Sequence, residues 1–565
     1  MNSRQVYDQW VNSPLISDEE RAELLSMDEA EIYEAFYKYA EFGTGGMRGK
    51  MGLGTNRLNR YMVRMAAKAM ADMLPDGGSA VIAFDTRNNS KEFAEETAKV
   101  MAAAGVKVYL FDRYSPVPLL SYAVRTLGAD GGVVITASHN TKEYNGFKAY
   151  DETGCQMLPD KASLIAENMA KMDDPFAIPT ADSIEASERI TLIGEDIAAG
   201  FENDIAGCGL EESTRAEQEA ICKDLKVVYT SIHGSGRDYV LQTLQQAGFE
   251  HVEITEGQAQ FDGNFPTVTK PNPEDPQALS MAADKAISEG VDIIIGTDPD
   301  CDRVGAGVVV TDEKTGERRV EYLTGNQMGA LLINYLCQIR KDAGSTDDGT
   351  LITTIVTGAM GPIVAADHGI QVKYVLTGFK YIGDIMNSME AENRLNEYFM
   401  GYEESYGYLT GTHARDKDGV SSALVICRMA AYYKAKGKNL IDVMNELYDT
   451  YGYWKDAQQS LVYEGAEGEA QMKEIMASLR DKKAGIFSEL TEEEIKYQDY
   501  ENEGTGLPKA DVLKYTFADG SWTAIRPSGT EPKIKIYYCM CGKDKNAADE
   551  RTKAVSAHLA GHMGA

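Results

Sequence analysis

The sequence predicts an α/β protein, with three similar α/β domains containing mixed sheets and a C-terminal α+β domain. Three segments repeat one order: strand, polar turn, helix, glycine, strand and, later, a further strand. The residues after about 455 abandon that order. A chain of 565 residues also exceeds what one core organises, at ~150 residues per domain. The predicted domains are 1–205, 206–322, 323–454 and 455–565.

The repeats consist of short β-branched runs that alternate with helical periods, which is typical of layered α/β structure. Their first strands are predicted at SAVIAF (79–84), LKVVYT (225–230) and TLITTIV (350–356). Each following helix is closed by a glycine, at a position where a left-handed C-cap is favoured: Gly105, Gly248 and Gly369.

Three unusual motifs each follow the last strand of their repeat: TASHN (136–140), DPDCDR (298–303) and GYEES (401–405). Ligands of open α/β sheets bind beyond the carboxyl ends of strands, so we expect these loops to line one large cleft. In the last domain, alternation such as KIKIYY (533–538) predicts an antiparallel sheet accompanied by helices.

The composition is that of a globular protein with a strongly acidic balance. Apolar residues make up 43% and charged residues 25%, and 56 Lys+Arg face 88 Asp+Glu. The average field repels nucleic acids and anionic membranes, so neither is an expected partner. A small anionic substrate would need a local cluster of Arg, Lys or metal.

Eight scattered cysteines without a CxxC pair predict neither a disulfide framework nor a zinc site. The N-terminus lacks a basic segment followed by an apolar run, and no stretch approaches ~18 consecutive apolar residues. We therefore expect a cytoplasmic enzyme.

The segment TASHNTKEYNGFKAY (136–150) places Ser138 in a loop rich in turn formers, followed by His139 and Lys148. A serine that accepts and donates a phosphoryl group needs nearby cations and a proton-handling group, which these two residues can supply. An ordinary Ser/Asn turn is the alternative. The loop is not the GxSxG elbow of a hydrolase.

The segment TDPDCDR (297–303) has carboxylates at Asp298, Asp300 and Asp302 after an apolar strand. Carboxylates this close repel one another unless a cation lies between them, which favours a Mg²⁺ site over a solvated acidic turn. An EF-hand is excluded, because Arg303 and Val309 stand where its glycine and carboxylate are needed.

The segment GYEESYGYL (401–409) offers Glu403 and Ser405, which can bind the hydroxyl groups of a sugar; a capped turn is the alternative. The nearby segments TGFKYIG (377–383) and HARDKDGV (413–420) add Thr377 and Lys417.

The segment RPSGTEPK (526–533) combines an arginine, hydroxyl groups and a glycine whose flexibility lets backbone N–H groups face an anion. It predicts a phosphate-binding loop unlike a Walker A motif. The glycine-rich segment 43–59 contains Arg48, and a flexible linker is its alternative.

Taken together and in this order, the four motifs resemble the α-D-phosphohexomutases, the phosphoglucomutase/phosphomannomutase family, over essentially the whole chain. The resemblance implies four domains around one large cleft, and a phosphorylated Ser138. It implies that Mg²⁺ is held by Asp298, Asp300, Asp302 and a phosphoserine oxygen. Proton transfer and transition-state charge would fall to Arg48, His139, Lys148 and Lys417. Substrate binding would fall to Arg303, Thr377, Gly378, Glu403, Ser405, Arg526, Ser528, Gly529 and Thr530.

The reaction implied by the resemblance interconverts glucose 1-phosphate and glucose 6-phosphate through glucose 1,6-bisphosphate, in a monomer or homodimer. Mannose or pentose phosphates are alternative substrates. A sugar-bisphosphate synthase and a non-catalytic sugar-phosphate-binding protein are alternatives of other classes. One departure from the family pattern is Thr141, which stands where the serine loop usually has proline and removes a fixed φ.

Overall fold

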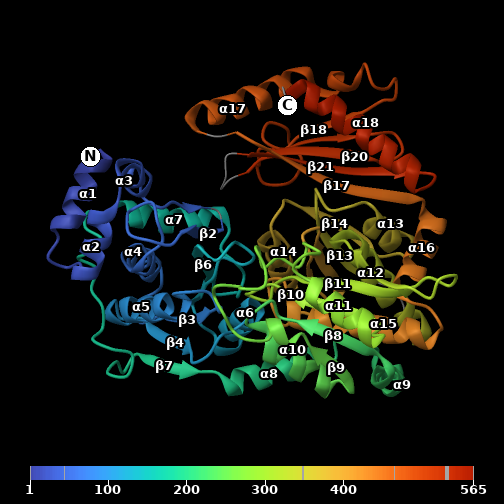
Figure 1. Cartoon of the computed structure of the whole chain (residues 1–565), viewed down its shortest axis with the longest axis horizontal. Helices are drawn as coiled ribbons and strands as arrows, with labels where there is room; N and C mark the ends of the chain where they lie inside the picture. Colours follow the sequence, from blue (N-terminus) through green and yellow to red (C-terminus); the bar gives the residue numbers. More distant parts are fainter. Residues whose placement is uncertain (1, 44, 346–348, 464, 529–532, 564–565) are drawn as a thin grey trace.

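The computed structural model describes residues 2–43, 45–345, 349–463, 465–528 and 533–563. Four sheets form in this part of the chain, and Figure 1 shows the sheets following one another along the sequence. Its helices are α1 (Ser3–Asn12), α2 (Asp18–Ser26), α3 (Glu29–Phe36), α4 (Arg60–Ala71), α5 (Ser90–Ala103), α6 (Val117–Leu127), α7 (Pro159–Ala170), α8 (Glu195–Ile205), α9 (Arg215–Ala220), α10 (Gly236–Gln246), α11 (Ser280–Glu289), α12 (Gly325–Asp342), α13 (Met360–Asp367), α14 (Phe379–Ala391), α15 (Gly419–Ala435), α16 (Leu440–Tyr451), α17 (Gly465–Lys482) and α18 (Lys545–Met563).

The first sheet has the strand order β1-β2-β6-β5-β3-β4-β7. Its strands β3, β4, β5 and β7 run parallel, whereas β1, β2 and β6 add antiparallel pairings. The bounds are β1 (Phe42–Gly43), β2 (Gly46–Lys50), β3 (Ser79–Phe84), β4 (Lys107–Phe111), β5 (Gly131–Ile135), β6 (Tyr144–Asp151) and β7 (Ile190–Ile193). The glycine-rich segment therefore supplies strand β2, and the linker interpretation of it is wrong.

The second sheet has the order β12-β11-β10-β8-β9 and the third β14-β13-β15-β16. In both, three parallel strands are followed by an antiparallel one, as in β4-β3-β5-β6 of the first sheet. The bounds are β8 (Lys226–Thr230), β9 (His251–Ile254), β10 (Ile293–Thr297), β11 (Val304–Thr311), β12 (Arg318–Leu323), β13 (Thr350–Thr354), β14 (Gln371–Val375), β15 (Tyr398–Glu403) and β16 (Gly407–Leu409). The three similar mixed-sheet units are confirmed.

The helices of the repeats end as predicted. Gly105, Gly248 and Gly369 follow α5, α10 and α13 with φ of 93°, 86° and 83°, in the left-handed region where a Cβ is disfavoured. One boundary differs from the sequence prediction. Gly401–Glu403 belong to strand β15 itself, so the GYEES motif begins inside the strand and only its end lies in a loop.

The C-terminal sheet is antiparallel throughout its described strands, in the order β17-β21-β20-β19-β18. Its bounds are β17 (Tyr453–Val462), β18 (Lys496–Asp499), β19 (Leu513–Thr516), β20 (Trp522–Pro527) and β21 (Lys533–Gly542). Helices α17 and α18 share one core with this sheet and lie together on its outer side (Figure 1). The predicted α+β domain is confirmed.

Helix α15 joins the units around the site. Nearly all its residues are buried, in a core that also includes side chains of the first, second and fourth sheets. The carboxylate of Asp418 caps its N-terminus by accepting from the N–H of Val420 (2.8 Å) and Ser421 (3.1 Å). The N–H of Gly419 donates to the carbonyl of Cys301 at 3.0 Å, which fixes this helix end against the aspartate loop. In the described chain no helix is long and apolar enough to cross a bilayer.

Candidate active site

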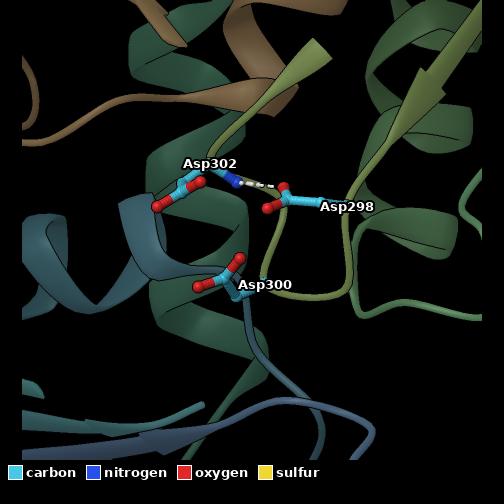
Figure 2. A group of neighbouring side chains, drawn as sticks. All are labelled: Asp298, Asp300 and Asp302. Carbon is cyan, nitrogen blue, oxygen red and sulfur yellow. Dashed lines mark hydrogen bonds between the residues drawn. The ribbon is translucent and has the colours of Figure 1, made fainter. Parts of the chain in front are cut away.

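The three aspartates lie in the turn between β10 and β11. Cys301 has a left-handed φ of 51°, which reverses the chain there. One Asp298 carboxylate oxygen closes the turn by accepting from the N–H of Asp302 (3.1 Å) and Arg303 (3.0 Å). All three aspartates are buried, and one oxygen from each lies within 4.8 Å of the others (Figure 2). The three carboxylates therefore converge, as a shared cation would require.

This cluster fits a hard divalent cation. Asp300 Oδ1 and Asp302 Oδ1 are buried, and neither has a hydrogen-bond partner within the described residues. A buried carboxylate oxygen without a partner is costly, whereas Mg²⁺ is bound preferentially by such oxygens. The residues present therefore suit a magnesium ion better than a structural turn.

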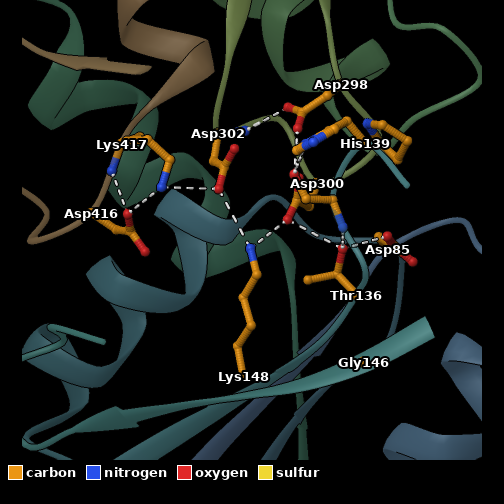
Figure 3. Close-up of polar contacts among 12 residues, drawn as sticks. Asp85, Thr136, His139, Gly146, Lys148, Asp298, Asp300, Asp302, Asp416 and Lys417 are labelled. Carbon is orange, nitrogen blue, oxygen red and sulfur yellow. Dashed lines mark hydrogen bonds and ion pairs between the residues drawn. The ribbon is translucent and has the colours of Figure 1, made fainter. Parts of the chain in front are cut away.

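Ser138 lies in the loop after β5 and faces the aspartates. Its backbone is left-handed (φ 51°), and its N–H donates to Thr136 Oγ1 at 2.8 Å. The side chain is thereby turned toward the second sheet, where Ser138 Oγ donates to Asp298 Oδ2 at 2.8 Å. His139 Nδ1 lies 3.1 Å from the same hydroxyl oxygen (Figure 3). The serine and the carboxylate loop thus form one site.

Arg87 organises the serine loop and was not singled out from the sequence. The guanidinium is buried and donates to the carbonyls of Ser138, Asn140, Thr141 (2.9 Å) and Tyr144 (3.1 Å). One of these hydrogen bonds fixes the carbonyl of Thr141, the residue that stands where the family usually has proline.

Asp85 also supports the serine loop. It accepts from Thr136 Oγ1 and Ser90 Oγ, both at 2.6 Å, and from the N–H of Arg87 at 2.9 Å. Both residues belong to DTRNNS, which follows the first strand of the first repeat. Their position directly after a strand of the repeat was the sequence signal that could have identified both residues.

Two lysines compensate the carboxylates. Lys148 Nζ, on β6, lies 2.8 Å from Asp300 Oδ2 and 3.4 Å from Asp302 Oδ2. Lys417 Nζ lies 3.2 Å from Asp302 Oδ2 and 3.0 Å from Asp416 Oδ1 (Figure 3). Burial lowers the pKa of each lysine, but the neighbouring carboxylates outweigh it and raise both above the usual value. Both side chains are therefore cations in the described site.

The carboxylates differ from one another. Burial, and then the charges of Asp300 and Asp302, raise the pKa of Asp298 well above its usual range. For Asp302, burial is outweighed by Lys417 and Lys148, which hold its pKa below the usual value. Burial, followed by the charges of Arg303 and Arg48, holds the pKa of His139 well below normal. A neutral His139 beside the hydroxyl of Ser138 can accept a proton from it.

The sugar-loop residues lie next to this cluster. Glu403 Oε1 accepts from the N–H of Gly378 at 2.8 Å, which joins the loop after β14 to the end of β15. Burial raises the pKa of Glu403, and the charge of Lys417 opposes that rise. Arg303 forms an ion pair with Glu274, a partner that the sequence did not indicate.

Two further residues of the predicted sugar site are Ser405 and Thr377. Ser405 is half-buried in the turn between β15 and β16. The hydroxyl oxygen of Thr377 is buried, and within the described residues it has no hydrogen-bond partner. A bound hydroxyl group would satisfy it.

The fourth domain contributes the end of an inner strand of its sheet, β20. Arg526 lies at the end of β20, and its buried Nε finds no acceptor in the described chain. Burial, and then the charge of Glu403, raise the pKa of Glu404 to about 7. The positive charge of Arg526 opposes this rise. The N–H of Ser528 donates to the carbonyl of Lys533 at 2.8 Å. The predicted phosphate ligands Gly529 and Thr530 lie outside the described residues.

The structure thus joins most of the predicted residues directly or through one neighbour. Arg48, on β2, donates to Asn140 Oδ1 at 3.1 Å and so lies beside the serine loop. Side-chain contacts connect the serine, the aspartates and the two lysines. The charge of Arg526 acts on Glu404, which directly follows β15. Tyr150, whose hydroxyl donates to Asp416 at 2.7 Å, is a further support that the sequence did not reveal.

Three mixed α/β units and a C-terminal domain around a serine–carboxylate cluster define a phosphotransferase-type isomerase. The family models match in order: "Phosphoglucomutase/phosphomannomutase, alpha/beta/alpha" domains I (residues 40–175), II (210–312) and III (324–451), and the C-terminal domain (464–555). The chain belongs to the phosphoglucomutase/phosphomannomutase family.

Similar curated proteins are phosphoglucomutases of Staphylococcus. That of S. haemolyticus is 35% identical over 522 residues, which cover 90% of this chain and 91% of the relative. That of S. epidermidis is 37% identical over 515 residues, covering 88% and 90%. Among solved structures, the open form of a Paramecium phosphoglucomutase, parafusin, has a TM-score of 0.71 at 18% identity, covering 94% of this chain and 96% of that one. This structural likeness supports the fold.

Proposed function

We propose that the protein interconverts glucose 1-phosphate and glucose 6-phosphate through a phosphorylated Ser138 and glucose 1,6-bisphosphate, with Mg²⁺ as cofactor. The observation that carries the proposal is the 2.8 Å contact between the Ser138 hydroxyl and a buried three-carboxylate cluster. An ordinary turn serine has no need of such a neighbour. The names of the Staphylococcus relatives support glucose as the sugar.

In the first half-reaction, the free hydroxyl of glucose 1-phosphate attacks the phosphorus of phospho-Ser138. A new P–O bond forms to the sugar, the P–O bond to Ser138 Oγ breaks, and the proton lost by the sugar hydroxyl ends on the departing serine oxygen. His139, 3.1 Å from Ser138 Oγ, is placed to exchange a proton with the departing serine oxygen. The bisphosphate then reorients, and its other phosphoryl group returns to Ser138, releasing glucose 6-phosphate.

Asp298, Asp300 and Asp302 would hold Mg²⁺ together with a phosphoserine oxygen. Bound there, the ion would neutralise charge on the transferring group. The cations Lys148 and Lys417 lie 2.8–3.4 Å from the carboxylates of Asp300 and Asp302 and hold them in place. Arg48, beside the serine loop, is available for charge on the equatorial phosphoryl oxygens.

Substrate orientation would fall mainly to the third and fourth domains. Thr377, Gly378, Glu403 and Ser405 would bind sugar hydroxyls, and Arg303 would add a cation at the same end. Arg526, with Ser528, Gly529 and Thr530, would bind the phosphate that is not being transferred. The unpaired Arg526 Nε supports that assignment among the described atoms, because a buried guanidinium N–H gains most from a phosphate oxygen. We further propose a cytoplasmic location and a monomer or homodimer.

Turnover assays on glucose, mannose and ribose 1-phosphates, with Mg²⁺ and trace glucose 1,6-bisphosphate, test the proposal. We expect glucose 1-phosphate to react fastest and Ser138→Ala to bind it without turnover. The exposed Ser288→Ala is the matched control and should retain full activity. Faster reaction of mannose or ribose phosphate would reassign the sugar. Net accumulation of bisphosphate from an added phosphoryl donor would indicate a synthase, and binding without any turnover would exclude an enzyme.

A further inference from the structure

The two lysines beside the aspartate cluster differ in their partners. Within the described residues, Lys148 Nζ pairs with Asp300 and Asp302, which are both predicted magnesium ligands. Lys417 Nζ contacts Asp302 at 3.2 Å and also Asp416 at 3.0 Å, and Asp416 lies outside the three-aspartate cluster (Figure 3). A cation on the aspartates would compete with Lys148 for its partners, whereas Lys417 would keep Asp416.

The carboxylate of Asp416 is held at both of its oxygens, and the residue is only 2% exposed. Its Oδ1 accepts from the backbone N–H of Lys417 at 2.8 Å and from the Lys417 ammonium at 3.0 Å. Its Oδ2 accepts from the hydroxyl of Tyr150 at 2.7 Å. A buried carboxylate that is bonded at both oxygens keeps one orientation, so Tyr150 fixes the direction from which Asp416 meets Lys417.

Tyr150 brings this support from another domain. It lies on β6 two residues after Lys148, so the two side chains project from the same face of the strand. Its ring is fully buried in the core that joins the sheets. The hydrogen bond to Asp416 therefore ties a strand of the first domain to the loop of the third domain that carries Lys417.

The aliphatic stem of Lys417 is confined as well. A methyl group placed on Gly407, the first residue of β16, would lie 2.1 Å from Lys417 Cδ and 2.7 Å from its Cγ. Only a residue without a Cβ therefore leaves room for this side chain. The ring centroid of Phe379 lies 5.6 Å from Lys417 Nζ, a distance at which the ring attracts the cation. These contacts keep the ammonium beside Asp302.

We propose that Tyr150 and Asp416 are positioning residues that hold the ammonium of Lys417 where charge develops on the transferring phosphoryl group. This inference rests on the proposed function. A cation that is already in place stabilises such charge without rearranging during the reaction, and a misplacement of ~1 Å can cost about 100-fold in rate. In the described structure neither Tyr150 nor Asp416 contacts Ser138, so both act through Lys417.

The test compares Tyr150→Phe with the matched control Tyr335→Phe. Each substitution removes one hydroxyl group from a buried ring of the same core, and that of Tyr335 donates to the carbonyl of Gly209 at 2.8 Å. Thermal unfolding should show a similar small loss of stability in both variants. In steady-state kinetics on glucose 1-phosphate with saturating Mg²⁺, only Tyr150→Phe should lose kcat, about tenfold, with little change in KM.

Three further variants reach the same lysine by other routes. Gly407→Ala keeps every charge but pushes the Lys417 stem aside, so kcat should fall about tenfold or more. Asp416→Asn removes the partner charge and should lower kcat about 10- to 100-fold. The double variant Tyr150→Phe/Asp416→Asn should be no slower than Asp416→Asn alone, because the hydroxyl acts through that carboxylate.

Equal kcat in Tyr150→Phe and Tyr335→Phe would overturn the positioning role, and so would losses that multiply in the double variant. Crystal structures of the wild type and of Tyr150→Phe give a readout that does not depend on activity. We expect the Lys417 ammonium to shift in the variant, and an unmoved ammonium would also overturn the inference. A shifted Lys417 in the variant of a protein that has no mutase activity would count against the proposed function alone.

Discussion

Replacing Asp300 with asparagine removes one of the three negative charges that face one another within 4.8 Å. At an effective dielectric constant of ~20, each carboxylate pair at that separation repels by about 3.5 kcal/mol, so about 7 kcal/mol of repulsion disappears. The lost attraction to Lys148, 2.8 Å away, is about 6 kcal/mol on the same scale. The two nearly cancel, so metal-free Asp300→Asn should be about as stable as the wild type.

Magnesium affinity should change much more. Removing an outer-shell partner of a metal ligand typically costs 10- to 100-fold in affinity, and loss of a charged ligand should cost at least about as much. At a Mg²⁺ concentration of 100 times the wild-type Kd, the wild type gains about 2.7 kcal/mol of stability. Asp300→Asn, whose Kd is then about 10- to 100-fold weaker, gains only about 0.4–1.4 kcal/mol at that concentration.

Isothermal titration with Mg²⁺ gives the two Kd values, and thermal unfolding across a Mg²⁺ series gives the stabilisation. The exposed Asp284→Asn is the control, since it removes a surface charge on α11 and should behave as wild type. High Mg²⁺ should partly restore activity in Asp300→Asn. A titration of Asp300→Asn that overlays that of the wild type would refute the metal site and leave the aspartates as a structural turn.

Three further predictions follow from the contacts. Arg87→Lys should keep the positive charge but lose the forked guanidinium group that binds four loop carbonyls. We therefore expect kcat to fall about 10- to 100-fold with little change in KM. Unchanged steady-state kinetics would contradict a positioning role for Arg87. The pKa of His413 in the folded protein is about 9, above its ordinary value, so the stability that its pairing with Asp418 contributes is complete below about pH 6.5 and is lost as the pH rises through 9. The difference in unfolding free energy between the wild type and His413→Gln, measured by denaturant unfolding, should therefore fall from roughly 3 kcal/mol over that pH window. A difference that stays constant with pH would be inconsistent with the Asp418 pair. Arg526→Ala should weaken sugar-phosphate binding by about 1.5–3 kcal/mol, and Arg526→Lys should restore little of it. In small-angle scattering we expect the wild type to contract when substrate binds and Arg526→Ala not to contract. Equal contraction of the two proteins would show that Arg526 does not drive closure.

Local patterns in the sequence revealed much of this site. Ser138 and the aspartates could be predicted because each follows a strand of a repeated unit, and the ends of parallel strands meet at one edge. The alternation after residue 455 likewise predicted the antiparallel sheet.

The supporting contacts could not be predicted. Arg87 binds carbonyl groups, and any residue type supplies a carbonyl, so no pattern marks its partners. The pair Tyr150–Asp416 joins segments 266 positions apart, which only the packing of the domains brings together. Arg303 and Glu274, 29 positions apart, are brought together by the folding of the second domain.

The most direct test of the account is the site of phosphorylation. The protein is incubated with glucose 1,6-bisphosphate, digested and analysed by peptide mass spectrometry, alongside Ser138→Ala. We predict one phosphoryl group, on the peptide that contains Ser138, its transfer to added glucose 1-phosphate, and no label on the variant. A phosphoryl group on another residue that is lost on adding glucose 1-phosphate, or a Ser138→Ala protein that still turns over, would contradict the central claim.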